Sequence, residues 1–504
     1  MQTATHHRAL YQLIVNRLDG QSISSASYCR AIVELVKNGI GGFIIFGGVK
    51  EDIKAFIKEL QGLSEQRLFI ASDIERGVGQ QIEGATHFPC QMAMAAAINM
   101  DVPDDVTLYK AAISAIAQES LDIGINMLLT PVLDVNTNPL NPIICTRAFS
   151  CDPAAVAWFG RVYIETLEAA GLISCAKHFP GHGDTEIDSH IALPVIGKTG
   201  VQLRESDFVP FAEAINAGVS SIMAAHIAIP AIDEAPASLS KTILSGILRD
   251  ELSFDGLILT DALNMDALKD IEDVEAKCLN AGADILLHPF DAVETVEGLI
   301  KCLSRGRLDS DRVTASYKRI LKAKHRPLTL LPLTLLNDTH DHSDISTRIT
   351  EKSITLVPGS KSPFIPEPSK TLLIEAGESK FHGSSCLTQY FTNHLSLSAR
   401  GISGDITGDI SGLTLLVAIY TNISAWRGSS GIPQPEIDTI KTFLEMAEHS
   451  AVISFGSPYL LSQFKESDFM IAAYEASKQA STAVLKCLKG QHRYEGRLPV
   501  VLPD

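Results

Sequence analysis

Short runs of apolar and β-branched residues recur through the first two-thirds of the chain, each followed by a loop and a helical pattern. Runs of this length that are apolar at nearly every position are typical of parallel strands buried on both faces. Several intervening segments open with Asp or Pro, as helices often do. The predicted strands are residues 43–46, 68–72, 126–132, 173–176, 221–225, 257–259 and 284–287, and the clearest helices are residues 106–121, 153–170, 207–217 and 291–303.

Strands that alternate with helices over roughly 330 residues predict an α/β fold of the (β/α)₈ TIM-barrel type. Polar residues at the ends of the strands favour this fold, because barrel enzymes build their sites there, whereas a doubly wound sheet has one switch point. Seven strands are recognisable, so closure of the barrel is inferred. The polar strand-end residues are Asp73, Asp134, Lys177, His178, His226, Asp261 and His288.

The character of the chain changes around residues 326–344, where a Pro- and Leu-rich stretch leads into a polar one. We therefore predict a catalytic barrel at residues 1–335, a linker at 336–350 and a smaller α/β domain with an open sheet at 351–504. This last domain contains no Gly-rich phosphate loop. Its predicted strands are residues 354–357, 371–374, 413–420 and 451–455, and its predicted helices are residues 435–447 and 473–488.

Composition narrows the function classes. The net charge of −17 argues against binding to nucleic acid or an anionic membrane, because both attract lysine and arginine, and it favours a small substrate that is neutral or modestly charged. The nine cysteines include no Cys-x-x-Cys pair and suggest neither a disulfide framework nor a zinc site.

The polar N-terminus resembles no signal peptide, and no apolar run is long enough to span a bilayer, so we expect a cytoplasmic protein. The sequence leaves the oligomeric state open.

The densest chemistry lies in residues 177–190, which hold three histidines, three acids and a lysine among glycines. Asp188 can accept the ring N–H of His190, which would fix the imidazole tautomer and suit it to act as a general acid and then as a base. The alternative is a solvated loop histidine beside a solvated acid. His182 is interpreted as shaping the loop.

Asp261 ends an apolar strand, where an unpaired charge is costly unless it has a purpose. Attack on the anomeric carbon of a sugar is such a purpose, and capping of the next helix is the alternative. Lys177 and His178 can hydrogen-bond sugar hydroxyls or serve as structural partners. A metal site at residues 178–190 is disfavoured, because the spacing matches neither the two-histidine helical pattern of metalloproteases nor a Cys/His module, and two glycines and a proline prevent a shared helix.

These residues resemble the β-N-acetylglucosaminidase branch of glycoside hydrolase family 3, in its two-domain form. The signature loop at residues 177–190 carries the resemblance, and further segments follow in the expected order over most of residues 40–300. They are Asp73-Ile-Glu75, residues 85–89, Pro131-Val-Leu-Asp134, residues 138–149, Pro236-Ala-Ser-Leu-Ser240, residues 254–256 and Thr260-Asp-Ala-Leu263.

The resemblance implies a retaining exo-β-N-acetylglucosaminidase that acts on cell-wall muropeptides in peptidoglycan recycling, with no metal or organic cofactor. It implies that Asp261 forms the covalent glycosyl-enzyme and that His190, held by Asp188, moves the proton. The residues implied to bind the sugar are Asp73, Arg147, Lys177 and His178.

The chain departs from the family pattern at Gln81, which stands where an arginine is usual eight residues after Asp73.

The alternatives to an N-acetylglucosaminidase are a β-glucosidase or β-xylosidase of the same family, a metal-dependent hydrolase and a catalytically silent sugar-binding barrel. Because a deprotonated histidine is uncharged, we also hypothesise that phosphate competes with water as the acceptor.

Overall fold

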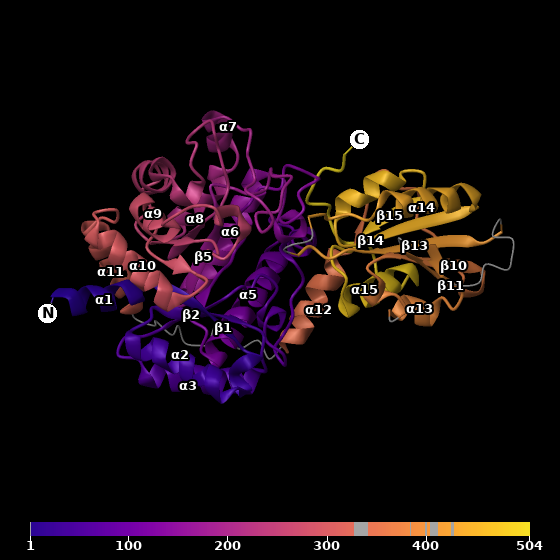
Figure 1. Ribbon diagram of the computed structural model, residues 1–504. Coiled ribbons are helices and arrows are strands. Elements are labelled where there is room, and N and C mark those ends of the chain that lie inside the picture. The colour runs from indigo at the N-terminus through magenta and orange to yellow at the C-terminus, as the bar shows by residue number, and fades with distance from the viewer. Residues whose placement is uncertain are drawn as a thin grey trace. The chain divides into compact units, whose positions relative to one another are not determined.

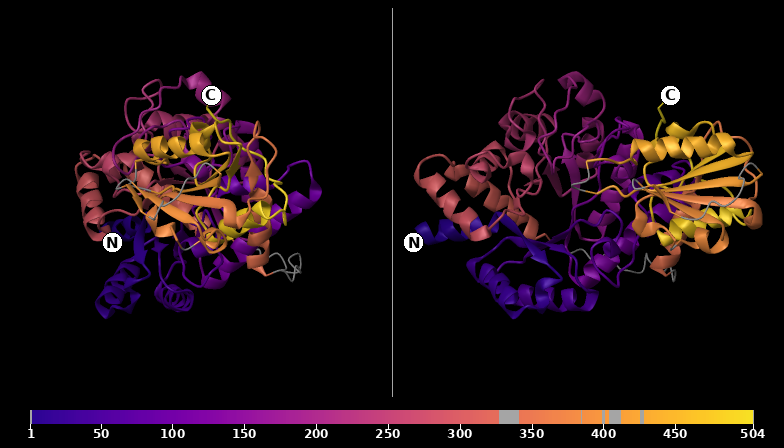
Figure 2. Two further views of the ribbon diagram at one scale, coloured as in Figure 1. Left: turned by 90° about the vertical axis from the view of Figure 1, so that its right-hand side faces the viewer. Right: turned by 45° about the vertical axis from the view of Figure 1, so that its right-hand side comes forward.

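The computed structural model describes residues 2–326, 341–383, 385–398, 401–403, 412–424 and 428–503 (Figures 1 and 2). Its contacts divide the chain into two compact units. The first comprises residues 1–88, 110–135 and 153–342, and the second comprises residues 89–109, 136–152 and 343–504. Two short segments from the first half of the sequence therefore belong to the unit that contains the C-terminal residues.

The first unit is a barrel of eight strands in the order β7-β6-β5-β4-β3-β2-β1-β8, and every neighbouring pair is parallel. A parallel bridge between Leu259 and Ile285 joins the two ends and closes the ring. The predicted TIM-type barrel is confirmed. The strands are β1 (Ile14–Asp19), β2 (Gly42–Phe46), β3 (Phe69–Ser72), β4 (Met127–Leu128), β5 (Ile173–Phe179), β6 (Ser221–Ala224), β7 (Leu257–Thr260) and β8 (Leu286–Leu287).

The barrel strand that was not predicted from the sequence is β1. Its polar residues Asn16 and Arg17 interrupt the apolar run that marks the other strands. Pairing with β2 and β8 on either side overrides this local pattern, because the backbone groups of a central strand are satisfied whatever its side chains are.

Helices surround these strands, as Figure 1 shows. Their apolar faces pack on the barrel; in α3, for example, Ile53, Phe56, Ile57 and Leu60 are buried at helical spacing. The helices with residues in this unit are α1 (Gln2–Gln12), α2 (Ala26–Asn38), α3 (Lys50–Leu63), α5 (Pro103–Ile123), α6 (Pro153–Ala169), α7 (Gly200–Glu205), α8 (Phe208–Asn216), the π-type η5 (Thr242–Glu251), α9 (Val274–Ala281), α10 (Ala292–Ser304) and α11 (Ser310–Lys324).

The second unit is built on a seven-stranded mixed sheet in the order β12-β11-β10-β13-β14-β15-β9, whose inner strands are parallel. This is the α/β domain that was predicted, with β11, β12 and β15 in addition to the strands recognised from sequence. The strands are β9 (Thr355–Leu356), β10 (Thr371–Gly377), β11 (His394–Ser398), β12 (Gly401–Ser403), β13 (Thr414–Tyr420), β14 (His449–Phe455) and β15 (Phe469–Ala472).

Alternate residues of this sheet serve two separate cores. Val417 faces a cluster that includes Ile440 of α14, and Leu416 faces one that includes Val484 of α15. Figure 1 shows α14 on one face of the sheet and α13 and α15 on the other. The helices are α4 (Gln91–Ala97), α12 (His342–Ser353), α13 (Cys386–Tyr390), α14 (Gln434–Met446) and α15 (Lys478–Leu488).

The predicted linker at residues 336–350 falls partly outside the described residues, which resume at Asp341. Its remainder is largely helical, because α12 begins at His342 and buries Ile345 and Ile349, one helical turn apart. The predicted domain boundaries stay predictions.

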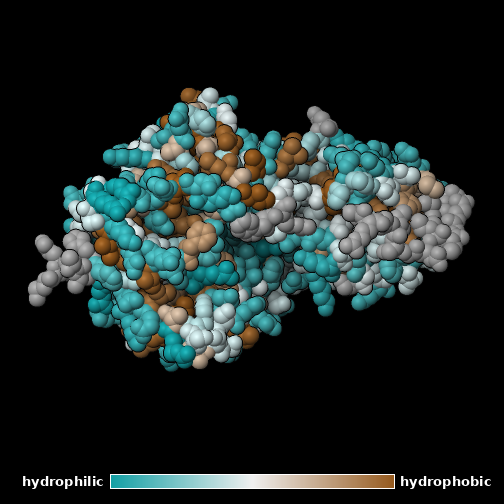
Figure 3. Space-filling model, viewed as in Figure 1, coloured by the Kyte–Doolittle hydropathy of each residue, from teal (hydrophilic) through white to brown (hydrophobic). Residues whose placement is uncertain are grey.

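The surface is mixed: on the face drawn in Figure 3, hydrophobic residues are interspersed among hydrophilic ones. Scattered exposed apolar residues are normal for globular proteins. Among the described residues, no helix combines the length and hydrophobicity needed to cross a membrane.

A buried lysine lies among groups that precede the strands, at the amino end of the barrel. Lys324, the last residue of α11, is 4% exposed, and its Nζ donates to Gln12 Oε1 at 2.8 Å and to the Gly41 carbonyl at 2.7 Å. The ammonium also lies 4.8 Å from the centre of the Phe69 ring. Burial lowers the pKa of Lys324 to about 7, because no full negative charge among these partners offsets the lost hydration.

We therefore expect Lys324 to make the stability of the protein depend on pH. The unfolded chain binds this proton up to about pH 10.4 and the folded chain only up to about pH 7, so the free energy of unfolding rises with pH between these values, by a total on the order of a few kcal/mol. Urea unfolding at pH 7, 8 and 9 should show this rise in the wild type and in the control Lys322→Met, whose side chain is exposed on the same helix. The rise should be smaller in Lys324→Met; equal slopes in all three proteins would contradict the expectation.

Candidate active site

The carboxyl ends of the barrel strands bring together the polar residues recognised in the sequence. Asp73 follows β3, Lys177 and His178 lie in the last three residues of β5, and Asp261 follows β7. Asp134 lies beyond β4, next to the Val132–Lys177 bridge that extends the pairing of β4 with β5. Residues far apart in the chain therefore converge on one rim of the first unit.

Lys177 is buried and neutralised by two acids. Its Nζ lies 2.8 Å from Asp73 Oδ1 and 2.6 Å from Glu75 Oε1, and its side chain is 2% exposed. The Asp73 side chain remains 28% exposed, so a ligand can reach it while Lys177 holds it in place. Sequence analysis assigned no role to Glu75, although an acid in a buried segment needs a cationic partner.

Asp134 joins the two ends of the Lys177–His182 segment. Its carboxylate accepts hydrogen bonds from the His178 ring at Nδ1 (2.7 Å), from the His178 backbone N–H (3.2 Å) and from the His182 backbone N–H (2.6 Å). Burial raises the pKa of this fully buried carboxyl, but His178 and His182 outweigh burial and lower it, so Asp134 is ionised. A carboxylate in this position fixes the ring orientation of His178.

The signature loop is held in shape by His182. Its Nδ1 lies 2.8 Å from Thr185 Oγ1 and its Nε2 lies 3.1 Å from Ser189 Oγ, so one ring spans the loop between these hydroxyls. Burial lowers the pKa of His182 to about 4, which leaves the imidazole neutral. Gly181 has φ = 128°, and an added Cβ would meet the Asp207 side chain at 2.9 Å, so glycine is required there. This geometry fits the loop-shaping interpretation of His182.

Asp188 and His190 form the pair predicted from their spacing. Asp188 Oδ1 lies 2.8 Å from His190 Nδ1 and 2.9 Å from the His190 backbone nitrogen. The Asp188 side chain is fully buried, whereas that of His190 is 25% exposed. If Asp188 is ionised, it accepts the Nδ1 hydrogen, and Nε2 becomes the ring nitrogen that exchanges protons with a ligand.

Asp261 is surrounded by histidines. Burial alone raises the pKa of its carboxyl, but His178, His226 and His190, together with the N–H of Ala262, outweigh burial and hold the pKa at about 2. The Ala262 nitrogen donates to Asp261 Oδ1 at 2.8 Å. Asp261 is therefore an ionised carboxylate at neutral pH, and its partial exposure leaves it accessible to a ligand.

Two further residues bear on the predicted sugar site. Arg147 belongs to the second unit, where its Nη1 donates to the Ile143 carbonyl at 3.0 Å and its own carbonyl accepts from Gln91 Nε2 at 2.9 Å. Its predicted contact with the sugar stays a prediction. Gln81, which replaces the family's usual arginine, donates from Nε2 to the Asp73 carbonyl at 3.4 Å and so supports the Asp73 loop through its backbone.

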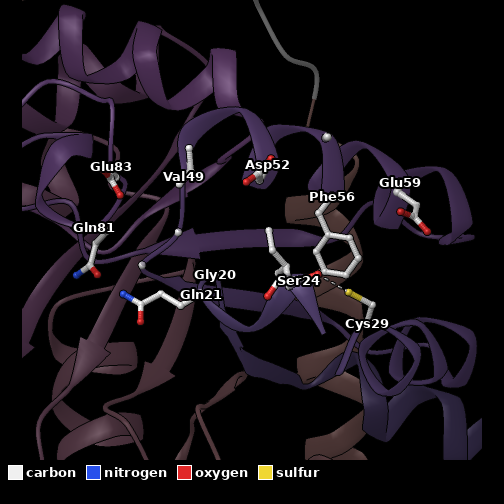
Figure 4. Close-up of a pocket in the computed structure, with 14 residues that line it drawn as sticks. Gly20, Gln21, Ser24, Cys29, Val49, Asp52, Phe56, Glu59, Gln81 and Glu83 are labelled. Atoms are coloured by element: carbon white, nitrogen blue, oxygen red, sulfur yellow. Dashed lines mark hydrogen bonds between the residues drawn. The ribbon is translucent and has the colours of Figure 1, made fainter. Parts of the chain in front are cut away.

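A separate cavity of about 730 Å³ lies beyond the carboxyl ends of β1 and β2 (Figure 4). Gln81 is part of its lining, and none of the predicted catalytic residues is. Figure 4 shows Gln81 and Glu83 at one end of the cavity and Glu59 and Cys29 at the other. The full lining is Gly20, Gln21, Ile23, Ser24, Cys29, Gly47, Gly48, Val49, Asp52, Ala55, Phe56, Glu59, Gln81 and Glu83.

The three histidines of the signature loop, which could in principle bind a metal, each hydrogen-bond to a protein side chain. His178 pairs with Asp134, His182 with Thr185 and Ser189, and His190 with Asp188. Within the described part of the chain, no group of three or more His, Cys, Asp or Glu residues is arranged to hold a metal ion. The chemistry available to these side chains is attack by an ionised carboxylate and proton transfer by an imidazole.

Removing the charge of Asp134 tests whether its hydrogen bonds to His178 and His182 position these residues for catalysis. Asp134→Asn should lower kcat about 10- to 100-fold, because His178 and the signature loop lose their common acceptor, and should lower the free energy of unfolding by about 3–5 kcal/mol. Steady-state kinetics and urea unfolding measure both.

Asp284→Asn is the matched control. Asp284 is also fully buried and ion-paired, with Arg249 Nη2 at 2.6 Å, but it lies before β8 at the opposite end of the barrel. This control should lose stability and keep kcat. Equal losses of kcat in the two variants would show that Asp134 acts only through stability.

Comparison with known proteins identifies relatives of the chain. The glycosyl hydrolase family 3 N-terminal domain matches residues 9–323. Beta-hexosaminidase A of Pseudoalteromonas piscicida is 29% identical, covering 96% of this chain and 94% of that protein. The beta-N-acetylglucosaminidase/beta-glucosidase of Cellulomonas fimi is 32% identical over 63% of this chain and 59% of its own length. The structure of a family 3 beta-N-acetylglucosaminidase from a Paenibacillus species superposes with a TM-score of 0.82 at 27% identity, covering 98% of each chain.

Proposed function

The chain belongs to glycosyl hydrolase family 3 and is a glycoside hydrolase, and we propose that it is a retaining exo-β-N-acetylglucosaminidase that works through a covalent glycosyl-aspartate. Its relatives include enzymes named for beta-hexosaminidase activity and one named for both beta-N-acetylglucosaminidase and beta-glucosidase activity. The broader class is therefore a β-hexosaminidase or β-glucosidase, and the narrower activity is our proposal.

In this mechanism Asp261 attacks the anomeric carbon of the terminal sugar. The ionised state of its carboxylate supports this role, because a nucleophile must be deprotonated when the substrate binds. His190 gives a proton to the leaving oxygen and then takes one from the water that releases the sugar. Asp188 orients the imidazole in both steps.

The observation that carries the proposal is the Asp188–His190 pair, with its 2.8 Å contact, on a rim that also presents Asp261. A β-glucosidase or β-xylosidase of this family usually lacks the Asp-x-His loop, so the pair favours an N-acetylglucosaminide as substrate. Asp73, with its partly exposed carboxylate, Lys177 and His178 are proposed to bind the sugar, and Lys177 also fixes Asp73. Arg147 is proposed as a further sugar contact.

Muropeptide fragments are the physiological substrate that the resemblance implies, and peptidoglycan recycling in the cytoplasm is part of the same proposal. The acetamido group at C2 distinguishes these substrates from glucosides. An exo mode follows if the site accepts only the terminal sugar unit.

The test compares aryl β-N-acetylglucosaminide with aryl β-glucoside. We expect kcat/KM to favour the N-acetylglucosaminide at least about 10-fold, which a difference of about 1.4 kcal/mol in transition-state binding provides. Rapid turnover of the glucoside alone would contradict the substrate assignment.

Variants of the two reacting residues test the mechanism. His190→Ala should lower kcat about 10²- to 10⁴-fold for a poor leaving group and less for an activated phenol, which needs little protonation. Asp261→Asn should abolish turnover of both kinds of substrate, the one with a poor leaving group and the one with an activated phenol. Glu186→Gln, an exposed acid on the same loop, is the control and should behave as wild type. A metal-dependent hydrolase would instead lose activity on dialysis against a chelator.

The choice of acceptor can be measured directly. Because a deprotonated His190 is uncharged, it repels an incoming phosphate less than a carboxylate would. We expect sugar 1-phosphate to appear beside free sugar when the reaction is run at high phosphate concentration, and its share to grow with that concentration. Release of free sugar alone at every phosphate concentration would contradict this hypothesis.

A further inference from the structure

Two buried residues that follow β6 are linked by hydrogen bonds to the segment of Asp261, His226 directly and Ser238 through His226, and the proposed mechanism gives them no role. His226 lies two residues beyond β6, and Ser238 lies in the short helix η4 (Ala237–Leu239); both are fully buried. Both stand in stretches that sequence analysis marked, His226 as a polar strand end and Ser238 within Pro236–Ser240. Buried polar groups at a reactive rim need a structural or functional reason.

The contacts of His226 define its tautomer. Its Nε2 lies 3.3 Å from the Ala262 carbonyl oxygen, and a carbonyl only accepts, so Nε2 carries the hydrogen. Its Nδ1, 2.7 Å from Ser238 Oγ, is then the acceptor, and the Ser238 hydroxyl donates to it. Burial lowers the pKa of His226, which favours the neutral ring of this arrangement.

Ala262 is thereby held at both of its backbone groups. His226 binds its carbonyl, and its N–H donates to Asp261 Oδ1 at 2.8 Å. The Asp261 backbone N–H in turn donates to the Ala224 carbonyl at the end of β6 at 2.9 Å. Asp261, which carries the carboxylate, and Ala262, which orients it, are therefore both hydrogen-bonded to residues at or just beyond the end of β6.

We propose that His226, held in one tautomer by Ser238, is a positioning residue for the Asp261 nucleophile. It acts through Ala262: fixing the carbonyl fixes the residue whose N–H binds Oδ1 and sets the direction of the attacking carboxylate. The inference rests on the proposed function, in which Asp261 forms the glycosyl-enzyme. It gives a role to the Pro236–Ser240 segment, which supplies the hydroxyl.

Loss of the Ser238 hydroxyl should weaken the series of hydrogen bonds from Ser238 through His226 to Ala262, and it should leave sugar binding unchanged. Without the donor, the ring is free to take the other tautomer, whose Nε2 lone pair faces the Ala262 carbonyl and repels it. Ala262 then shifts and its N–H moves away from Oδ1. A displacement of about 1 Å in a reacting group costs up to about 100-fold in rate, so the effect falls on the chemical step and not on binding.

The experiment measures formation of the glycosyl-enzyme in Ser238→Ala and in a matched control, Ser240→Ala. Ser240 is equally buried on the same segment, but its Oγ donates to Asp233 Oδ2 at 2.6 Å and does not contact His226. The rate is read from the burst of phenol released from an aryl β-N-acetylglucosaminide and from labelling of Asp261 by a fluorinated glycosyl fluoride. Thermal unfolding shows that each variant is folded at the assay temperature.

We expect Ser238→Ala to form the glycosyl-enzyme about 10- to 100-fold more slowly with KM unchanged, and Ser240→Ala to stay within about 3-fold of wild type. His226→Leu should lose at least as much as Ser238→Ala. His226→Gln, whose amide can still donate to the Ala262 carbonyl, should recover most of the rate. Equal rates in the two serine variants, or no recovery with His226→Gln relative to His226→Leu, would overturn the proposal.

Failure of the proposed function can be told apart from failure of the His226 inference, because the wild type is measured before the variants. If the wild type labels Asp261 with a glucoside reagent only, the sugar assignment is wrong and the variants are compared with that reagent. If no reagent labels Asp261 in the wild type, both the proposed function and this inference fall. If His226→Leu does not fold, the serine pair alone decides.

Discussion

Closure of eight parallel strands into a ring is the constraint on which the candidate site depends. Parallel strands all end on the same rim, so every polar residue that follows a strand is brought there whatever its distance in sequence. The ring is completed by β1, whose pairing with β2 and β8 leaves only the short contact between β7 and β8 to close it. With β1 absent, the ring would be open between β2 and β8.

The rim concentrates charge in a place with little water, and each charge is compensated by a nearby group. Lys177 is placed between two acids, Asp134 accepts three hydrogen bonds, and Asp188 holds His190. Unpaired charges in such a place would cost several kcal/mol each. Lys177, Asp134 and Asp188 are buried, whereas Asp73, His190 and Asp261 remain partly exposed. The site thus separates a fixed framework from the groups that can meet a ligand.

Backbone contacts carry much of this framework. Ser238, His226 and Ala262 form a chain of hydrogen bonds that reaches Asp261, and Asp134 binds two backbone N–H groups of the signature loop. Such contacts lock the geometry before a substrate arrives, which lowers the reorganisation needed in the transition state. Gln81 fits this pattern, because it supports Asp73 through the backbone where the family usually has a charged arginine.

Local patterns in the sequence predict the fold class and seven of the eight barrel strands, and the sequence also shows the residue types at the strand ends, because periodicity and strand-end chemistry are local properties. It also placed Asp188 two residues from His190, a spacing short enough to predict their contact. It did not reveal β1, the pairing of Asp134 with a histidine 44 residues away, or the link from Ser238 to Ala262. It did not show that residues 89–109 and 136–152 belong with the C-terminal unit. These features depend on the three-dimensional fold, because strand register and barrel closure set which distant groups meet, and no local pattern in the sequence records that.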